Sequence, residues 1–173
     1  NLVVKSQQSQ TKAVVTTWKT YINKQLHISF QYPATWSQHQ AVNVINRTGL
    51  NASTEVQFVD TIQEKRFQLI YHSAPAGENL YRYALQQYNE TKGWYAENKR
   101  EMIVAGRKAL VATSTVTMNG KGNVLSTPLK SVVVVFLDQQ DKGEFELQYT
   151  VPDDGRADDK ELQHILSSIQ FIQ

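Results

Sequence analysis

Histidine is the first side chain to consider, because it can ligate a metal or transfer protons near neutral pH. The chain has four, at His27, His39, His72 and His164. None pairs as H-x-H or H-E-x-x-H, the latter a spacing that brings two imidazoles onto one face to bind zinc. We expect His27 on the outward face of a strand and His164 on the polar side of the last helix. Solvated histidines are the favoured interpretation, and a metal bound through distant partners is the alternative.

Carboxylates are densest near the C-terminus, and their spacing lacks the D-x-D-x-D-G pattern of a calcium loop. Asp158-x-x-Glu161 is instead typical of a capping box, and negative charge is favourable at the start of a helix. We favour this structural role over a cation site. The cluster comprises Asp153, Asp154, Asp158, Asp159 and Glu161.

The pair His72-Ser73 places a hydroxyl beside an imidazole in the sequence. Adjacent strand residues point to opposite faces, which argues against a reacting pair. The chain also has no cysteine, no G-x-S-x-G elbow, no G-x-G-x-x-G and no P-loop. We therefore predict that the protein is not an enzyme, has no cofactor, and has no catalytic, cofactor-binding or metal-ligating residues. An enzyme assembled from distant segments is the alternative.

An aromatic-rich segment covers residues 81–95. Exposed aromatic side chains often anchor protein interfaces. The favoured interpretation is that these residues cover the sheet, and partial exposure as interface anchors is the alternative. They are Tyr81, Tyr83, Tyr88, Trp94 and Tyr95.

Composition indicates a globular chain. Its 173 residues are 40% hydrophobic and 20% charged, which suits one domain with a core of its own. The formal net charge of +2, without a basic stripe, predicts no nucleic-acid partner. No apolar run approaches the roughly 20 residues that span a bilayer.

The N-terminal residues 1–16 are rich in Gln, Ser and Thr and show little periodicity. We predict a tether or arm here, with a short strand over residues 2–4 as the alternative, followed by a single domain over residues 17–173. Because the chain begins at Asn1 rather than Met, we expect a mature or trimmed form, in which any signal peptide is out of view.

The elements that must position these side chains begin in residues 18–36, WKTYINKQLHISFQYPATW. Alternation predicts a strand that ends at Tyr32, because Pro33 cannot donate to a ladder. Two Trp and two Tyr brought together by one turn can seed a core. The alternating apolar positions are Leu26, Ile28, Phe30 and Tyr32.

Seven or eight strands and two helices are predicted in all. The continuously apolar run 131–137 predicts a central strand covered on both faces. Helices are expected over residues 79–91 and from Asp158, where Leu162, Ile165, Leu166 and Ile169 follow helical spacing. The fold class is α+β with a mainly antiparallel sheet. The other strands are expected over residues 42–45, 55–62, 66–72, 101–104, 108–117 and 144–151.

Several motifs, in order along residues 18–171, resemble bacterial PsbP-like proteins. Trp18-x-x-Tyr21 with Tyr32-Pro33-x-x-Trp36 resembles their opening. Residues 104–109 (VAGRKA) are similar to their (I/V)-A-G-x-x-A strand junction, and residues 165–171 (ILSSIQF) to their I-L-x-S-F-x-F finish. Ile169 stands where the family usually has Phe, and the polar loop 46–53 is longer.

The resemblance implies an α/β/α sandwich around a central, mainly antiparallel sheet, the fold shared by PsbP and the Ran-binding nuclear import factors. It also implies an extracytoplasmic setting, at the cell surface or secreted, often behind a lipoprotein signal that anchors the protein to a membrane. The family brings no catalytic residues.

Three functions follow as hypotheses. The first is a non-catalytic accessory or binding module with a protein partner at the cell surface. The second is a carrier that binds a small ligand or a metal in a cleft between sheet and helix, which a polar-lined cavity would support. The third is an enzyme of unrecognised type, which requires convergent titratable groups in a cleft.

Overall fold

The computed structural model describes residues 16–41, 52–73, 100–118, 121–154 and 159–173. In these ranges the chain forms ten strands and one helix, α2 (Lys160–Ser168). No described helix combines the length and apolar character needed to cross a membrane. The strands are β1 (Trp18–Asn23), β2 (Ile28–Pro33), β3 (Ser37–Ala41), β4 (Ala52–Asp60), β5 (Lys65–Ser73), β6 (Arg100–Val104), β7 (Arg107–Met118), β8 (Val124–Leu137), β9 (Gly143–Pro152) and β10 (Gln170–Phe171).

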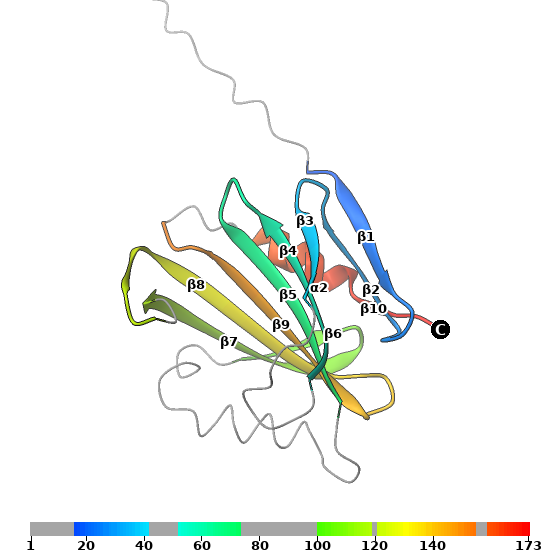
Figure 1. The fold of residues 1–173 in the computed structure, drawn as a ribbon. Coiled ribbons are helices and arrows are strands. Elements are labelled where there is room, and N and C mark those ends of the chain that lie inside the picture. Colours follow the sequence, from blue (N-terminus) through cyan, green and yellow to red (C-terminus); the bar gives the residue numbers. More distant parts are fainter. Residues whose placement is uncertain (1–15, 42–51, 74–99, 119–120, 155–158) are drawn as a thin grey trace, which may run out of the picture.

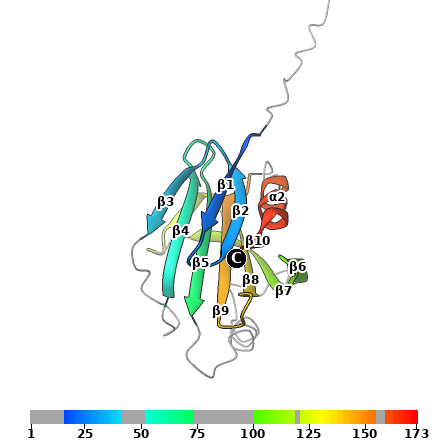
Figure 2. The same cartoon turned by 90° about the vertical axis from the view of Figure 1, so that its right-hand side faces the viewer.

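The strands form two sheets. One has three strands in the order β1-β2-β10, and the other has seven in the order β3-β4-β5-β9-β8-β7-β6. Every neighbouring pair is antiparallel. The small sheet and α2 lie side by side over one face of the large sheet (Figures 1 and 2). The prediction of a sheet-dominated, mainly antiparallel α+β fold is therefore confirmed.

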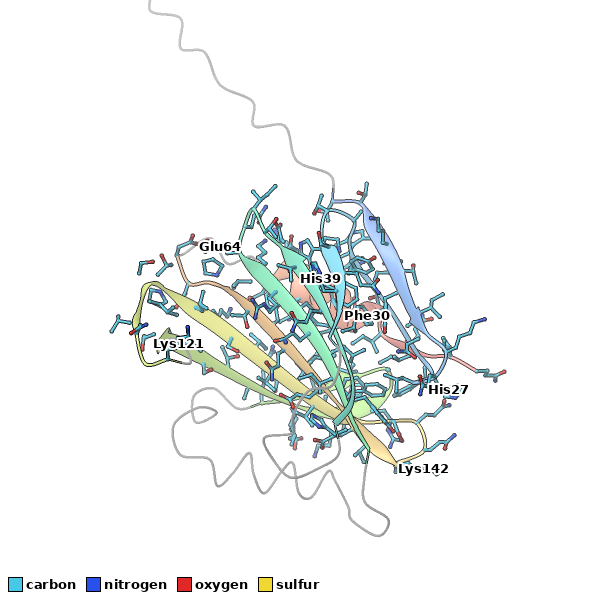
Figure 3. The ribbon with its side chains drawn as sticks, in the orientation of Figure 1. His27, Phe30, His39, Glu64, Lys121 and Lys142 are labelled. Carbon is cyan, nitrogen blue, oxygen red and sulfur yellow. The ribbon has the colours of Figure 1, made fainter. Side chains whose placement is uncertain are left out.

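The core lies between these two layers. Side chains of β9 alternate across the sheet, and four of them point into the core with at most 2% exposure: Phe145, Leu147, Tyr149 and Val151. On the opposite layer, Phe30 of β2 (Figure 3) places its ring centroid 5.4 Å from those of Phe58 and Phe67. From α2, Leu162, Ile165 and Leu166 complete the core.

Strand β8 is an interior strand, as its apolar run predicts, with β9 on one side and β7 on the other. The consecutive residues Val132, Val133 and Val134 are all buried, so both faces are covered. The strand begins seven residues before the predicted start at 131. Its early part contains Pro128, which lies beyond the last pair with β9, Leu129 with Pro152, where a proline is tolerated.

Several strand boundaries differ from prediction. Strand β2 begins at Ile28 rather than Leu26, because His27 has a φ of 53°, which a β-strand cannot accommodate. Leu26 lies in the preceding turn and still packs against the core. Strand β2 also includes Pro33, one residue past the expected end. The strands expected over residues 55–62 and 66–72 form the β4–β5 hairpin, with its turn over residues 61–64.

Three elements were not predicted. One is strand β1, which pairs with β2. Strand β3 has the polar sequence SQHQA and pairs with β4, so its strand character comes from its partner rather than from hydrophobic alternation. Strand β10 is two residues long and pairs with Ser29 and Ile28 of β2. The predicted strand 42–45 and helix 79–91 lie outside the described residues. The predicted tether, apart from Thr16, lies outside them as well.

Candidate functional site

A cluster of ionisable side chains lies in register on the face of the large sheet opposite the core. Residue His72 of β5 is directly opposite Glu144 of β9, and Glu146 follows two residues later on the same face. The Nε2 atom of His72 lies 3.1 Å from Oε2 of Glu146, with the side chains 11% and 19% exposed. Gln148 donates to the other oxygen of Glu146.

Glu144 is the buried member of this cluster, at 7% exposure. Burial raises its pKa to about 7, an effect that the nearby His72 opposes and Glu146 reinforces. Burial lowers the pKa of His72, but the hydrogen bond to Glu146 and the two carboxylates outweigh it, so the net shift is upward. Within the described residues, Oε2 of Glu144 and Nδ1 of His72 have no hydrogen-bond partner. The cluster can therefore take up protons near neutral pH.

The other three histidines do not join it. His39 is exposed on β3, and His27 is exposed but lies in the β1–β2 turn rather than on a strand (Figure 3). The prediction for His164 is wrong. Its ring stacks on Trp18 at 3.6 Å and its Nε2 lies 2.8 Å from Oε1 of Gln31, so it faces the small sheet. Among the described residues, no group of three or more His, Asp or Glu is arranged to hold a metal ion.

The C-terminal carboxylates act as separate structural groups in the described part of the chain. Asp159 is the N-cap residue of α2, but its side chain makes no capping bond and binds Nζ of Lys130 at 2.8 Å. Glu161 binds Nζ of Lys65 at 2.7 Å, which fastens the first turn of α2 to β5. Asp158, the other member of the predicted capping box, and the aromatic segment 81–95 lie outside the described residues.

A groove of about 550 Å³ lies beside the β4–β5 turn. It is lined by residues 62–65, Thr127, residues 151–152 and Asp154; we call it the hairpin groove. Asp60 organises the turn, because its Oδ1 accepts the N–H groups of Ile62 and Gln63 at 2.9 and 3.0 Å.

The turn presents an apolar side chain to solvent. Ile62 is 91% exposed, the highest value of any large hydrophobic side chain in the described residues. Glu64, with a φ of 56°, lies at the same tip (Figure 3). The one cationic lining residue, Lys65, is already paired with Glu161. The hairpin groove therefore combines an exposed apolar rim with carboxylates.

A second cavity, of about 420 Å³, lies at the opposite end of the large sheet. It is lined by residues 25–27 of the β1–β2 turn, 138–140 and Lys142 of the β8–β9 turn, Tyr71, and residues 171–173; we call it the turn cavity. The two turns approach each other in Figures 1 and 2, and Figure 3 labels His27 and Lys142 there. Helix α2 contributes no lining residue to either cavity, so neither is the sheet–helix cleft expected of a carrier.

Asp138 holds the wall of the turn cavity in place. Its Oδ1 accepts the N–H groups of Gln140 and Lys142, each at 2.9 Å, and its Oδ2 accepts the hydroxyl of Tyr71 at 2.8 Å. Burial, together with Asp138, raises the pKa of Tyr71 well above its ordinary value, so the phenol stays protonated and donates. Gly143 makes this contact possible, since an added Cβ would overlap the Tyr71 ring.

Sequence reasoning missed both cavities and the carboxylates Glu144 and Glu146. The alternation of β9 placed these two glutamates on the outward face, where solvent exposure is the default expectation. The turn cavity combines three segments that are far apart in the chain. A weak signal existed in the glutamine-rich sequence of the β8–β9 turn, DQQDK.

Comparisons with known proteins identify the fold. No family model matches the sequence, and no curated protein matches it. Solved structures that superimpose on it include three of different origin. A protein from Bacteroides thetaiotaomicron matches with a TM-score of 0.58 and 14% identity over 90% of this chain. The chain spans 48% of that protein's length.

The other two neighbours are matched over nearly their whole length. Cyanobacterial PsbP (CyanoP) from Synechocystis has a TM-score of 0.56 and 15% identity, with 95% of this chain and 98% of CyanoP covered. The Ran-binding protein Mog1p of Saccharomyces cerevisiae has a TM-score of 0.51 and 12% identity, with 92% and 97% covered. At these identities the likeness concerns the fold alone. The chain therefore has a PsbP-like fold, shared with Mog1p.

Proposed function

We propose that this protein is a non-catalytic binding module that acts outside the cytoplasm on a protein partner. The observation that carries the proposal is the hairpin groove, where Ile62 is 91% exposed beside a hollow of about 550 Å³. Apolar side chains exposed at the rim of a groove are typical of interaction sites. The fold is consistent with this role, because Mog1p binds Ran.

The partner is expected to present an apolar side chain flanked by a cation. The cation would meet Glu64, while Lys65 remains paired with Glu161 at 2.7 Å. A net charge of +2 gives no general attraction to nucleic acid, so we propose no nucleic-acid partner. We further propose that residues 1–16 tether the domain at the cell surface.

Site-directed photo-crosslinking in cells that produce the full-length protein tests this proposal. A photoreactive amino acid in place of Ile62 is expected to capture one polypeptide, recovered in the extracytoplasmic or membrane fraction and absent when Glu64 is also replaced by Lys. The matched control is Ile103, which is 67% exposed on β6, an edge strand of the large sheet. Equal capture from both positions, or capture only in the cytoplasmic fraction, would contradict the proposal.

A second candidate function is that of a carrier for a small organic ligand. The turn cavity favours it, because its volume of about 420 Å³ lies within the range of ligand pockets, roughly 300–1,000 Å³. The described residues offer no metal-binding group of three, so the carrier would take an organic ligand.

A further inference from the structure

The turn cavity is lined by polar groups that the protein itself leaves available. Four glutamines border it, at positions 25, 139, 140 and 173. No hydrogen bond joins their side-chain amides to another described residue, and all four are exposed. An amide donates and accepts at once, as a hydroxyl group does. Four such amides around one cavity therefore match a ligand with several hydroxyl groups.

The turn cavity is lined by one carboxylate, Asp138, and one ammonium group, Lys142. The carboxylate of Asp138 is already occupied, because its two oxygens accept Tyr71 and the N–H groups of Gln140 and Lys142. The ammonium of Lys142, by contrast, makes no ion pair with any described residue. Asp138 keeps its negative charge but its oxygens are used within the protein, so the ammonium of Lys142 is the lining charge that can bind a carboxylate of a ligand.

An apolar wall completes the cavity. Tyr71 packs on Phe145 at a ring-centroid distance of 5.0 Å, and Phe171 lies 6.3 Å from the same ring. The position of Phe171 is fixed in turn by the backbone bond from Ile172 N–H to the carbonyl of His27, 2.9 Å long. An aromatic wall of this kind packs against the C–H face of a sugar ring.

We infer that the turn cavity binds a sugar acid, a saccharide unit that carries one carboxylate. The glutamine amides bind its hydroxyl groups, Tyr71 and Phe171 pack against the ring, and Lys142 binds the carboxylate. A phosphorylated sugar fits less well, because a phosphate monoester carries about −1.5 to −2 charges at neutral pH and faces a single ammonium. This inference rests on the second candidate function, and it names the class of ligand.

Titration of the full chain, followed by backbone amide NMR shifts, tests the inference with four probes: D-glucuronate, D-glucose, glucose 6-phosphate and acetate. D-glucuronate is expected to shift residues 25–27, 138–142 and 171–173 and to bind about tenfold tighter than D-glucose, a difference of about 1.4 kcal/mol. Lys142→Gln is expected to abolish this preference. Gln139→Ala is expected to weaken both sugars.

The matched control is Lys121→Gln, an exposed lysine beside the β7–β8 turn, far from His27 and Lys142 in Figure 3. It is expected to leave the affinity for D-glucuronate unchanged. Equal or tighter binding of glucose, glucose 6-phosphate or acetate in the turn cavity would overturn the sugar-acid assignment and leave the carrier function standing. No shift at the turn cavity with any probe would overturn both. The proposed protein partner is tested separately at Ile62.

Discussion

At the scale of single residues, the unusual feature is a carboxyl group buried in a sheet. Glu144 is 7% exposed, and its Oε2 finds no hydrogen-bond partner in the part of the chain that the structure describes. A buried carboxylate is costly because it loses hydration, so the protonated form is favoured. This explains why its pKa rises from 4.5 to about 7. His72, whose pKa is also raised, lies opposite Glu144 in the neighbouring strand.

The raised pKa of Glu144 makes stability depend on pH. Between about pH 4.5 and 7 the unfolded chain has lost a proton that the folded protein keeps, so folding takes up a proton. The free energy of unfolding therefore falls as pH rises through this window, by at most about 1.4 kcal/mol per pH unit for one proton. The raised pKa of His72 acts with the same sign, since its contribution is lost as pH rises above 6.5.

We expect Glu144→Gln to reduce this pH dependence. Between pH 4.5 and pH 8, the free energy of unfolding should fall less in Glu144→Gln than in wild type. Urea denaturation at both pH values measures the two free energies of unfolding. Glu64→Gln, which replaces an exposed carboxylate, is the matched control. If Glu144→Gln and wild type changed by the same amount between the two pH values, the burial argument would be wrong.

At the scale of elements, one hydroxyl group joins the end of α2 to β2. Strand β10 pairs with Ile28 and Ser29 only, so beyond it the ladder of β2 needs another partner. Oγ of Ser168 supplies it by accepting the N–H of Gln31 at 2.8 Å, while donating to the carbonyl of Ile165 at 2.7 Å. The hydroxyl is thus used both as acceptor and as donor.

Ser168→Ala is expected to lower the free energy of unfolding by about 1–3 kcal/mol, because it leaves a partly buried N–H group unpaired. Chemical denaturation measures the loss, and hydrogen exchange at Gln31 should become faster. The neighbouring Ser167→Ala is the control, since Ser167 is exposed and donates only within its own helix, to the carbonyl of His164. Equal effects of the two substitutions would count against this role of Ser168.

At the scale of the whole molecule, stability depends on packing between the small sheet and the large sheet. Phe30 is 1% exposed and contacts aromatic rings from both layers, Tyr21 at 5.0 Å and Phe58 at 5.4 Å. Phe30→Ala removes this link, and a loss of about 3–5 kcal/mol is expected. Guanidinium denaturation measures it, with Phe30→Leu as a milder variant that should fold.

Ile22→Ala in the same hairpin is the control, because Ile22 is 58% exposed and surface substitutions change stability by about 0.5 kcal/mol or less. A loss below about 1 kcal/mol for Phe30→Ala would mean that the small sheet contributes little to the core.

The sequence by itself determined the elements whose burial repeats with a regular period. The strand predicted over residues 144–151 is β9, in which Phe145, Leu147, Tyr149 and Val151 alternate, and in α2 the apolar residues follow helical spacing. The apolar run in β8 was enough to place it inside the sheet. The spacing of apolar residues predicts these features, because each depends only on the directions in which side chains of a single segment point.

Only the tertiary structure decided the features that depend on pairing between distant segments. The polar strand β3 exists because β4 lies beside it, and His164 faces inward because Trp18 stacks on it. The turn cavity combines residues 25–27, 138–140 with Lys142, and 171–173, and Glu144 is buried although its strand predicts exposure. Burial and proximity are non-local, because the order of strands in a sheet sets which turns meet, and no local pattern encodes that order.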